Sequence, residues 1–422
     1  MKRKILLFIV LFLSISCKHN STVESAKMDV DLNFSGIKTI PVDTTGCITF
    51  SIKEAGRCDM NILADNVEYI PLETSNNILV GEIKKLIFHN DRFYILDTSE
   101  AQSVFIFGSD GKYINAISSL GRGPNEYLTL TNMTLDKFNN KLILLDDRLH
   151  DLLYYDLDGN FLKKEKIGIR IHDLARINNE DFVLLSGHAW NIQLSDNDNF
   201  GITIGDPSGI LKWRAFEMDK FYKSQNIMGE NLLFQNETGV FYSAPFTNEV
   251  YHLSPEGKIS LKYRFLLPNG SPQLYRSINK TGIEFLKEIS TKSIWYNDGS
   301  NFMETNKFVF ASITIGSSNV AYFVYDKISK DYFVYYTNNG WGTGRVMGLL
   351  KPMTTDGDNL FSVLQAYSVT SGKKANEEGR TPEGWELPEI LKGVKEDDNP
   401  IIIKYNIKTP ILDSYINEKV LR

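Results

Sequence analysis

Val104-Phe105-Ile106-Phe107 is an apolar run that leads into the turn Ser109-Asp110-Gly111-Lys112. The same arrangement recurs before Gly159, Gly209 and Gly257, so successive glycines lie 48, 50 and 48 residues apart. A period near fifty residues is typical of β-propeller blades. A hairpin turn explains the glycine, because the two-residue turns that suit strand twist need positive φ.

Two weaker copies of the unit follow, at residues 321–325 and 401–405, which makes six units in all. Each unit also contains an earlier, nearly unbroken apolar run, such as Leu142-Ile143-Leu144-Leu145. Unbroken runs of this length indicate strands covered on both faces, as in blades packed face to face. The sequence therefore predicts an all-β fold, a six-bladed β-propeller.

The two ends of the repeat suggest how the ring closes. The sixth unit lacks a final outer strand, whereas residues 66–73 form a strand-like segment with no unit of its own. Pro71 favours an edge position for this segment, because proline has no N–H for a central ladder. We expect residues 66–73 to complete the sixth blade, which removes the unpaired edges of an open sheet.

Two stretches interrupt the period and read as insertions. Residues 271–292, between units four and five, have the pattern of a short helix around residues 283–289. Residues 368–399 are expected to hold a second short helix at residues 387–395. Long insertions in a compact fold often carry function.

The N-terminus has the layout of a bacterial lipoprotein signal. A basic Met1-Lys2-Arg3-Lys4 precedes an apolar stretch from Ile5 to Ile15, which stops at Ser16-Cys17. Eleven apolar residues are too few to span a bilayer, which needs roughly 20 in a helix. We predict a signal peptide at residues 1–16, lipidation of Cys17, a polar tether at residues 17–45 and the propeller at residues 46–422. The lipid would make the membrane a partner of this protein.

Charge and cysteine content narrow the functional classes. The formal net charge is −6 and no basic cluster is present, so nucleic-acid binding, which needs a basic surface, is not expected. Cys47 and Cys58 remain after lipidation of Cys17. In an oxidising envelope these two could form a disulfide, but their spacing leaves paired and free states open.

Three segments carry a resemblance to a known family: Val67-Glu68-Tyr69-Ile70-Pro71-Leu72-Glu73-Thr74, Gly121-Arg122-Gly123-Pro124-Asn125-Glu126-Tyr127 and Glu396-Asp397-Asp398-Asn399-Pro400. With them the chain resembles the six-bladed β-propeller lipoproteins of Gram-negative bacteria, relatives of the NHL-repeat propellers. The resemblance implies the fold and a place in the cell envelope, at the outer membrane. It carries over no catalytic residue and no ligand.

The segment from Gly121 to Tyr127 is one candidate binding loop. It follows an outer strand and precedes the next innermost strand, predicted at residues 128–135, which places it on the face where ligands enter propellers. Arg122 offers a planar set of donors, Glu126 two acceptor oxygens and Tyr127 an aromatic face, a set suited to a sugar, peptide or carboxylate. Alternatively, the glycines and proline shape a tight turn in which Arg122 and Glu126 pair.

Other predicted loops supply further candidates: His172, His188, Trp190, Trp341 and Arg345. An exposed tryptophan can stack on a sugar ring, although these indoles could equally pack between loops. His172 and His188 could meet at a channel mouth, but each alone is more often an ordinary polar contact. We predict no metal and no cofactor.

Motifs for hydrolysis are missing from the sequence. It contains neither a His-Glu-x-x-His pair nor a Gly-x-Ser-x-Gly elbow. The leading hypothesis is a non-catalytic binding propeller for a carbohydrate, a peptide or a partner protein of the envelope. One alternative is a lyase or hydrolase acting on polysaccharide or peptide at the channel. Another is a structural subunit whose insertions, residues 271–292 and 368–399, dock on an envelope assembly.

Overall fold

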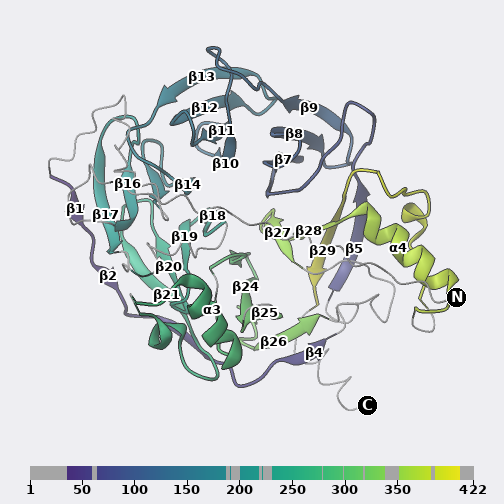
Figure 1. Ribbon diagram of the computed structural model, residues 1–422. Coiled ribbons are helices and arrows are strands. Elements are labelled where there is room, and N and C mark those ends of the chain that lie inside the picture. The colour runs from purple at the N-terminus through teal and green to yellow at the C-terminus, as the bar shows by residue number, and fades with distance from the viewer. Residues whose placement is uncertain are drawn as a thin grey trace, which may run out of the picture.

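The fold is a ring of six β-sheets around a common axis (Figure 1). The computed structural model describes residues 36–58, 64–186, 191, 200–217, 221, 231–277, 279–297, 299–316, 319–337, 351–381 and 385–408. The ring confirms the predicted all-β, six-bladed propeller. The predicted signal peptide and Cys17 lie outside the described residues.

Each blade is an antiparallel meander that starts beside the axis and ends at the rim. Blade 1 contains β6 (Lys85–His89), β7 (Arg92–Asp97), β8 (Ser103–Gly108) and β9 (Tyr113–Ile117). Blade 2 contains β10 (Leu130–Asp136), β11 (Lys141–Asp146), β12 (Asp151–Asp156) and β13 (Phe161–Lys166). Blade 3 contains β14 (Asp173–Arg176), β15 (Phe182–Leu185), β16 (Phe200–Gly205) and β17 (Leu211–Glu217).

The remaining blades follow the same plan. Blade 4 contains β18 (Leu233–Asn236), β19 (Gly239–Ala244), β20 (Glu249–Leu253) and β21 (Ile259–Leu266). Blade 5 has a divided first strand, and contains β22 (Trp295–Tyr296), β23 (Met303–Glu304), β24 (Phe308–Ile315), β25 (Asn319–Asp326) and β26 (Tyr332–Thr337). Blade 6 contains β27 (Pro352–Thr355), β28 (Leu360–Leu364), β29 (Ile401–Ile407) and β5 (Ala64–Pro71).

The core lies between the blades. Middle strands such as β11 and β12 are buried almost throughout, because each has a neighbouring blade on both faces. Tyr94 and Leu96 of blade 1, for example, share a cluster with Leu142 and Leu144 of blade 2. Unbroken apolar runs in the sequence therefore become the contacts that stack one blade on the next.

The ring closes through its N-terminal strand, as predicted. β5 pairs antiparallel with β29 and is the outermost strand of blade 6. Pro71 lies opposite Ile401 in this pair, and its missing N–H is tolerated because no further strand follows β5 in the sheet. Two distant parts of the chain thus make one blade.

A belt of four short strands runs around the rim before β5, visible as the purple segment in Figure 1. β1 (Lys38–Thr39) pairs parallel with β17, β2 (Val42–Asp43) and β3 (Ile48–Ser51) pair with β21, and β4 (Gly56–Cys58) pairs with β26. The predicted tether was therefore too long, since residues 38–43 already belong to the propeller. The physical reason is that the outer strands of blades 3, 4 and 5 offer free backbone groups for pairing.

The repeated glycines are explained only in part by positive φ. Gly111, Gly159 and Gly257 have φ values of 81°, 85° and 78°, as predicted for hairpin turns. Gly209 is an exception: its N–H bonds to the Asp206 carbonyl at 3.2 Å, as the other three glycines bond to the residue three before them, but its φ is not positive. The prediction for Gly209 was wrong.

The first insertion contains the predicted helix. It consists of the 3₁₀ turn η2 (Pro272–Tyr275) and helix α3 (Gly282–Thr291). A capping box between Thr281 and Glu284 satisfies the free N–H groups at the start of α3. Phe285 and Ile289 anchor the helix in a cluster with Phe246.

The second insertion differs from the prediction. Its helix, α4, spans Ala366–Glu377, and residues 387–395 hold only the 3₁₀ turn η3 (Glu389–Leu391). Gly393 lies inside the predicted segment, and its low helix propensity disfavours a longer helix there. α4 forms instead because its buried side, including Val369 and Ala375, packs on the blade.

Within the described residues, no helix is both long and apolar enough to cross a membrane.

Candidate functional site

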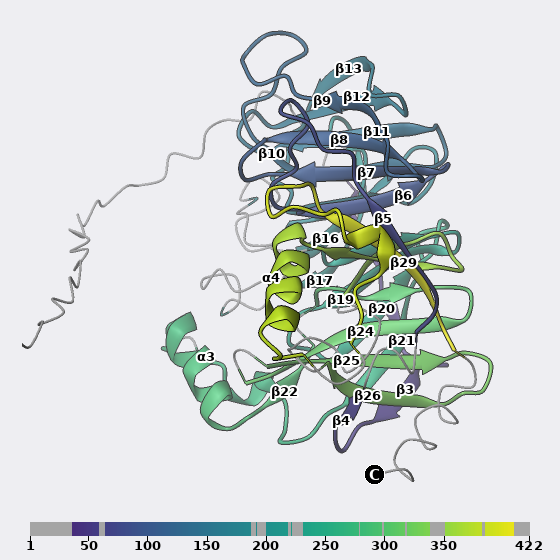
Figure 2. The ribbon, with the colours of Figure 1, turned by 90° about the vertical axis from the view of Figure 1, so that its right-hand side faces the viewer.

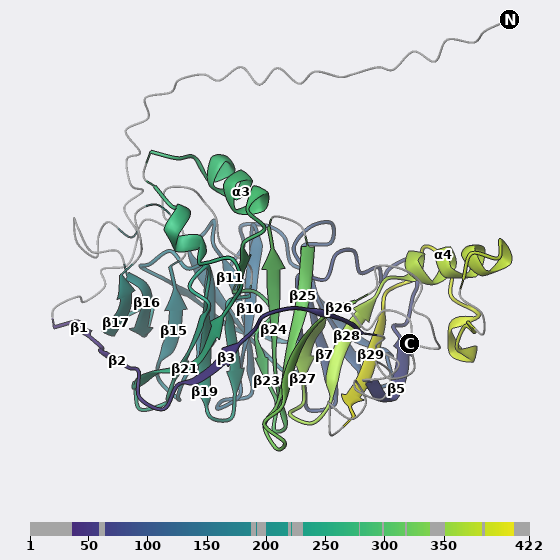
Figure 3. The same cartoon turned by 90° about the horizontal axis from the view of Figure 1, so that it is seen from below.

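The two faces of the ring are unequal. The connections from one blade to the next, and from the second to the third strand of a blade, open on one side, here called the loop face. Both α3 and α4 project from this side, as Figures 2 and 3 show. The opposite side, here called the turn face, carries the connections between first and second strands and between third and fourth strands, such as the tight turns at Gly111 and Gly159.

The predicted loop from Gly121 to Tyr127 lies on the loop face as a self-bonded turn. The Gly121 N–H donates to the Tyr127 carbonyl at 2.9 Å, and the Glu126 carboxylate accepts from the Gly123 N–H at 2.6 Å. Lys164 of β13 donates to the Gly123 and Glu126 carbonyls, both at 3.0 Å. Glu126 therefore holds the turn and does not pair with Arg122, whose side chain is exposed.

Tyr127 does not offer an aromatic face to a ligand. Its side chain is 0% exposed, and its hydroxyl donates to the Gln102 carbonyl at 2.6 Å. Burial raises the pKa of this hydroxyl. The prediction of Tyr127 as a contact residue was wrong, because the ring fills the space between blades 1 and 2.

A polar hollow of about 360 Å³ lies at the loop-face mouth of the central channel. His172 lines it, in the position expected for this residue. The lining residues come from the inner ends of blades 1 to 4: Lys84, Thr98, Thr129, Leu130, Thr131, Asn132, Asp147, Ile171, His172 and Asn231. Hydroxyl, amide, carboxylate and imidazole groups thus converge on one space.

An ion pair between blades 1 and 3 lies deeper in the channel. The Lys85 ammonium of blade 1 lies 3.1 Å from an Asp173 carboxylate oxygen of blade 3, and it donates to the Asn132 side-chain carbonyl at 2.9 Å. Asp173 is fully buried and accepts further bonds from the Asn132 amide and from the Leu233 N–H. This network joins the first four blades. Its only sequence signal is a charged residue at the start of two innermost strands, Lys85 of β6 and Asp173 of β14.

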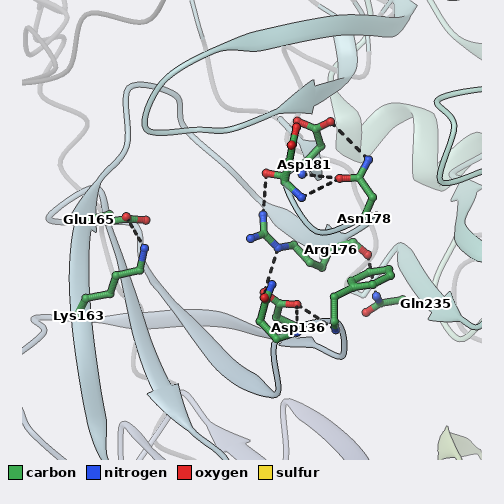
Figure 4. A network of polar contacts seen from close by, with 10 residues as sticks. Asp136, Lys163, Glu165, Arg176, Asn178, Asp181 and Gln235 are labelled. Atoms are coloured by element: carbon green, nitrogen blue, oxygen red, sulfur yellow. Dashed lines mark hydrogen bonds and ion pairs between the residues drawn. The ribbon is translucent and has the colours of Figure 1, made fainter.

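A second buried network lies toward the turn face and is shown in Figure 4. The Arg176 guanidinium pairs with Asp136 at 3.1 Å, lies over the Phe182 ring at 4.1 Å and donates to the Glu180 carbonyl at 2.9 Å. Gln235 donates to the Arg176 carbonyl at 2.7 Å. Each group is held by groups of the blades themselves, so we assign this network to structure.

Several candidates cannot be placed. His188, Trp190, Trp341 and Arg345 lie outside the described residues and stay predictions. Cys47, just before β3, is a free cysteine in the structure. The side chain of Cys58, at the end of β4, lies outside the described part of the structure, so the pairing of these two cysteines stays a prediction.

Among the described residues, no three His, Cys, Asp or Glu side chains gather as metal ligands would. Large apolar side chains are exposed on both loop-face insertions. Leu274 and Ile283 of the first insertion are 76% and 80% exposed, and Tyr367 and Ile390 of the second are 59% and 56% exposed.

The fold and the loop-face mouth define a six-bladed β-propeller protein with a polar channel entrance. The model of the family DUF4934, a domain of unknown function, matches residues 38–406, and the chain belongs to this family.

Solved structures resemble the chain at low sequence identity. A candidate exported protein from Bacteroides fragilis is 20% identical, with a TM-score of 0.70 over 86% of this chain and 100% of that one. A DUF4221 member from Bacteroides vulgatus is 11% identical, with a TM-score of 0.47 over 82% and 97% of the two chains. The first of these likenesses shows the fold alone. No curated protein sequence matches the chain.

Proposed function

We propose that this protein is an outer-membrane lipoprotein whose loop face binds a ligand without catalysis, with carbohydrate as the preferred class over a peptide or a partner protein. The observation that carries the proposal is the polar hollow beside His172 at the channel mouth. The residues that line the hollow lie on the loop face, from which α3 and α4 project (Figure 3).

The chemistry of the hollow favours a ligand rich in hydroxyl groups. Thr98, Thr129 and Thr131 contribute hydroxyls, Asn231 an amide and Asp147 a carboxylate. Hydroxyl and amide groups both donate and accept, as sugar hydroxyls do. A volume of about 360 Å³ falls within the range of small-molecule sites, roughly 300–1,000 Å³.

A paired blocking experiment tests the binding site. Thr129→Trp places an indole in the hollow from a position just before β10, and Thr238→Trp adds the same bulk on the turn face as a matched control. We expect titration calorimetry against a glycan panel to show binding that Thr129→Trp weakens by at least about tenfold and Thr238→Trp leaves unchanged.

Two outcomes would overturn parts of this proposal. Binding of peptides in place of glycans, still lost on Thr129→Trp, would keep the site and reject carbohydrate. Absence of binding to glycan, peptide and envelope-extract panels would reject the binding function itself.

The lipid anchor is tested separately. The basic start, the apolar stretch and Ser16-Cys17 support lipidation of Cys17. Cys17→Ser is expected to abolish incorporation of labelled palmitate and to release the protein from outer-membrane fractions, whereas Cys47→Ser should do neither. Labelling that survives Cys17→Ser would contradict the anchor.

A further inference from the structure

A second hollow, of about 290 Å³, opens on the turn face at the other end of the channel. Strand ends and turns of blades 1, 2, 4, 5 and 6 surround it. It shares Phe88, Lys137, Phe234, Gln235 and Thr355 with a deeper cavity, and the two spaces therefore join.

The deeper cavity is the size of one small apolar group. Its volume is about 120 Å³, and Phe88, Phe234, Phe302 and Met353 contribute to its lining. A cavity of about 150 Å³ in another protein holds benzene. Lys85, paired with Asp173, lies at its far end. A ring or a branched alkyl group entering from the turn face would therefore fill the cavity and stop there.

Most charged groups at the turn-face rim are already engaged. Lys327 bonds to the Glu304 carboxylate and to the Thr305 carbonyl, at 2.8 and 2.9 Å. Glu304 also accepts from the buried Tyr263 hydroxyl at 3.0 Å. Asp356 accepts from the N–H groups of its own turn. None of these groups can turn to a ligand without breaking a buried or local bond.

Lys137 and His89 differ from the other rim residues. Lys137 pairs at 3.2 Å with Glu237, whose side chain is 89% exposed, and such pairs contribute little to stability. The Nε2 atom of His89 is buried and has no hydrogen-bond partner among the described residues. A buried polar atom without a partner is costly, and in one neutral tautomer Nε2 carries a proton to donate. The Lys137 ammonium thus borders the same hollow as the His89 residue, whose Nε2 atom lies beneath the surface.

We propose that the turn-face mouth binds a small carboxylate that bears an apolar group. The carboxylate accepts from Lys137 and, once the His89 ring turns to expose its Nε2 atom, from His89 as well, and the apolar group enters the deeper cavity against Phe88 and Phe234. Free aryl or branched alkyl acids share this chemistry with the C-terminus of a peptide that ends in an apolar residue. This site is separate from the loop-face hollow and does not depend on it.

Titration calorimetry with matched probes tests the site on the whole protein. N-acetylphenylalanine is expected to bind, and its amide, which lacks the carboxylate, to bind at least about tenfold more weakly. N-acetylglycine, which lacks the ring, should bind as weakly as the amide. A tetrapeptide ending in phenylalanine separates the two sources: affinity equal to that of N-acetylphenylalanine indicates a peptide C-terminus, and a loss of about tenfold or more indicates a free acid.

Three variants identify the residues. Lys137→Met keeps most of the stem and removes the charge, so the affinity for N-acetylphenylalanine should fall by at least about tenfold, whereas Lys141→Met, at the next strand start, should leave it unchanged. Glu237→Gln frees Lys137 and should raise the affinity. Equal binding of the acid and the amide, no effect of Lys137→Met, or no binding up to the solubility limit of the probes would overturn the proposal.

Discussion

Ile402 of β29 lies opposite Ile70 of β5, and this pair joins the two ends of the propeller. Ile70 is 6% exposed and packs with Phe93 of blade 1 and Phe361 of blade 6. Ile70→Ala should lower the free energy of unfolding by about 2–5 kcal/mol, the usual range for such core truncations. Chemical denaturation measures the change.

The control for ring closure lies two residues earlier on β5. Glu68 is exposed and lies 3.9 Å from Lys404, so Glu68→Ala should change the free energy of unfolding by no more than about 0.5 kcal/mol. An equally small effect of Ile70→Ala would mean that β5 does not hold blade 6.

The rim belt should contribute to stability although it lies outside the blades. Phe50 of β3 is 1% exposed and contacts the rings of Phe265 and Phe323 at centroid distances of 5.6 and 4.7 Å. Phe50→Ala should cost about 3–5 kcal/mol of unfolding free energy. The matched change Ile48→Ala, at a residue 37% exposed, should cost much less. If both variants unfolded like the wild-type protein, the belt would be a tether after all.

The sequence allowed the ring and its closure to be predicted because both depend on local signals. The glycine spacing revealed the blades, and Pro71 indicated an edge strand. The belt left no such signal, since strands of two to four residues such as β1 and β3 are too short to show a period of two. Helix α4 was missed because Gly372 and the β-branched Val369 have low helix propensity, which tertiary packing overrides.

The candidate site was harder to predict than the fold. His172 could be placed near the channel mouth because it follows an outer strand and precedes an inner one. Lys85 and Asp173 could not be paired, because their contact depends on how far the side chains of blades 1 and 3 reach into the channel past blade 2. Tyr127 was misjudged because a tyrosine in a loop gives no sign of whether its ring points inward.

The ion pair between Lys85 and Asp173 should contribute far more to stability than a surface pair. Asp173→Ala would leave the Lys85 ammonium, whose side chain is 15% exposed, without its carboxylate. We expect a loss of about 3–5 kcal/mol in unfolding free energy. Glu165→Gln breaks the partly exposed pair with Lys163 and should cost about 0–1 kcal/mol. Equal losses in denaturant titrations would show that the pair does not hold the blades.

Stability should fall on the acid side because buried histidines resist protonation. Burial lowers the pKa of His150, with Arg170 and Lys166 acting in the same direction and Asp147 and Asp146 against it. The folded state then binds fewer protons than the unfolded chain, so this contribution is complete above the ordinary histidine pKa of about 6.5 and declines as the pH falls below it.

His150→Asn tests this dependence, because asparagine tolerates the φ of 54° at this position. The melting temperature of the variant should fall less than that of the wild-type protein between about pH 7.5 and about pH 5.5. Because burial also lowers the pKa of His89 and His252, some decline should remain. An identical decline in both proteins would remove His150 from the explanation.

The position of a bound glycan tests the proposed function most directly. A crystal structure with the tightest ligand from the glycan panel should show the sugar at the loop-face mouth, in contact with Asp147, His172 and the hydroxyls of Thr129 and Thr131. A glycan bound at the rim or at the turn-face mouth, with the hollow beside His172 left to solvent, would contradict the account.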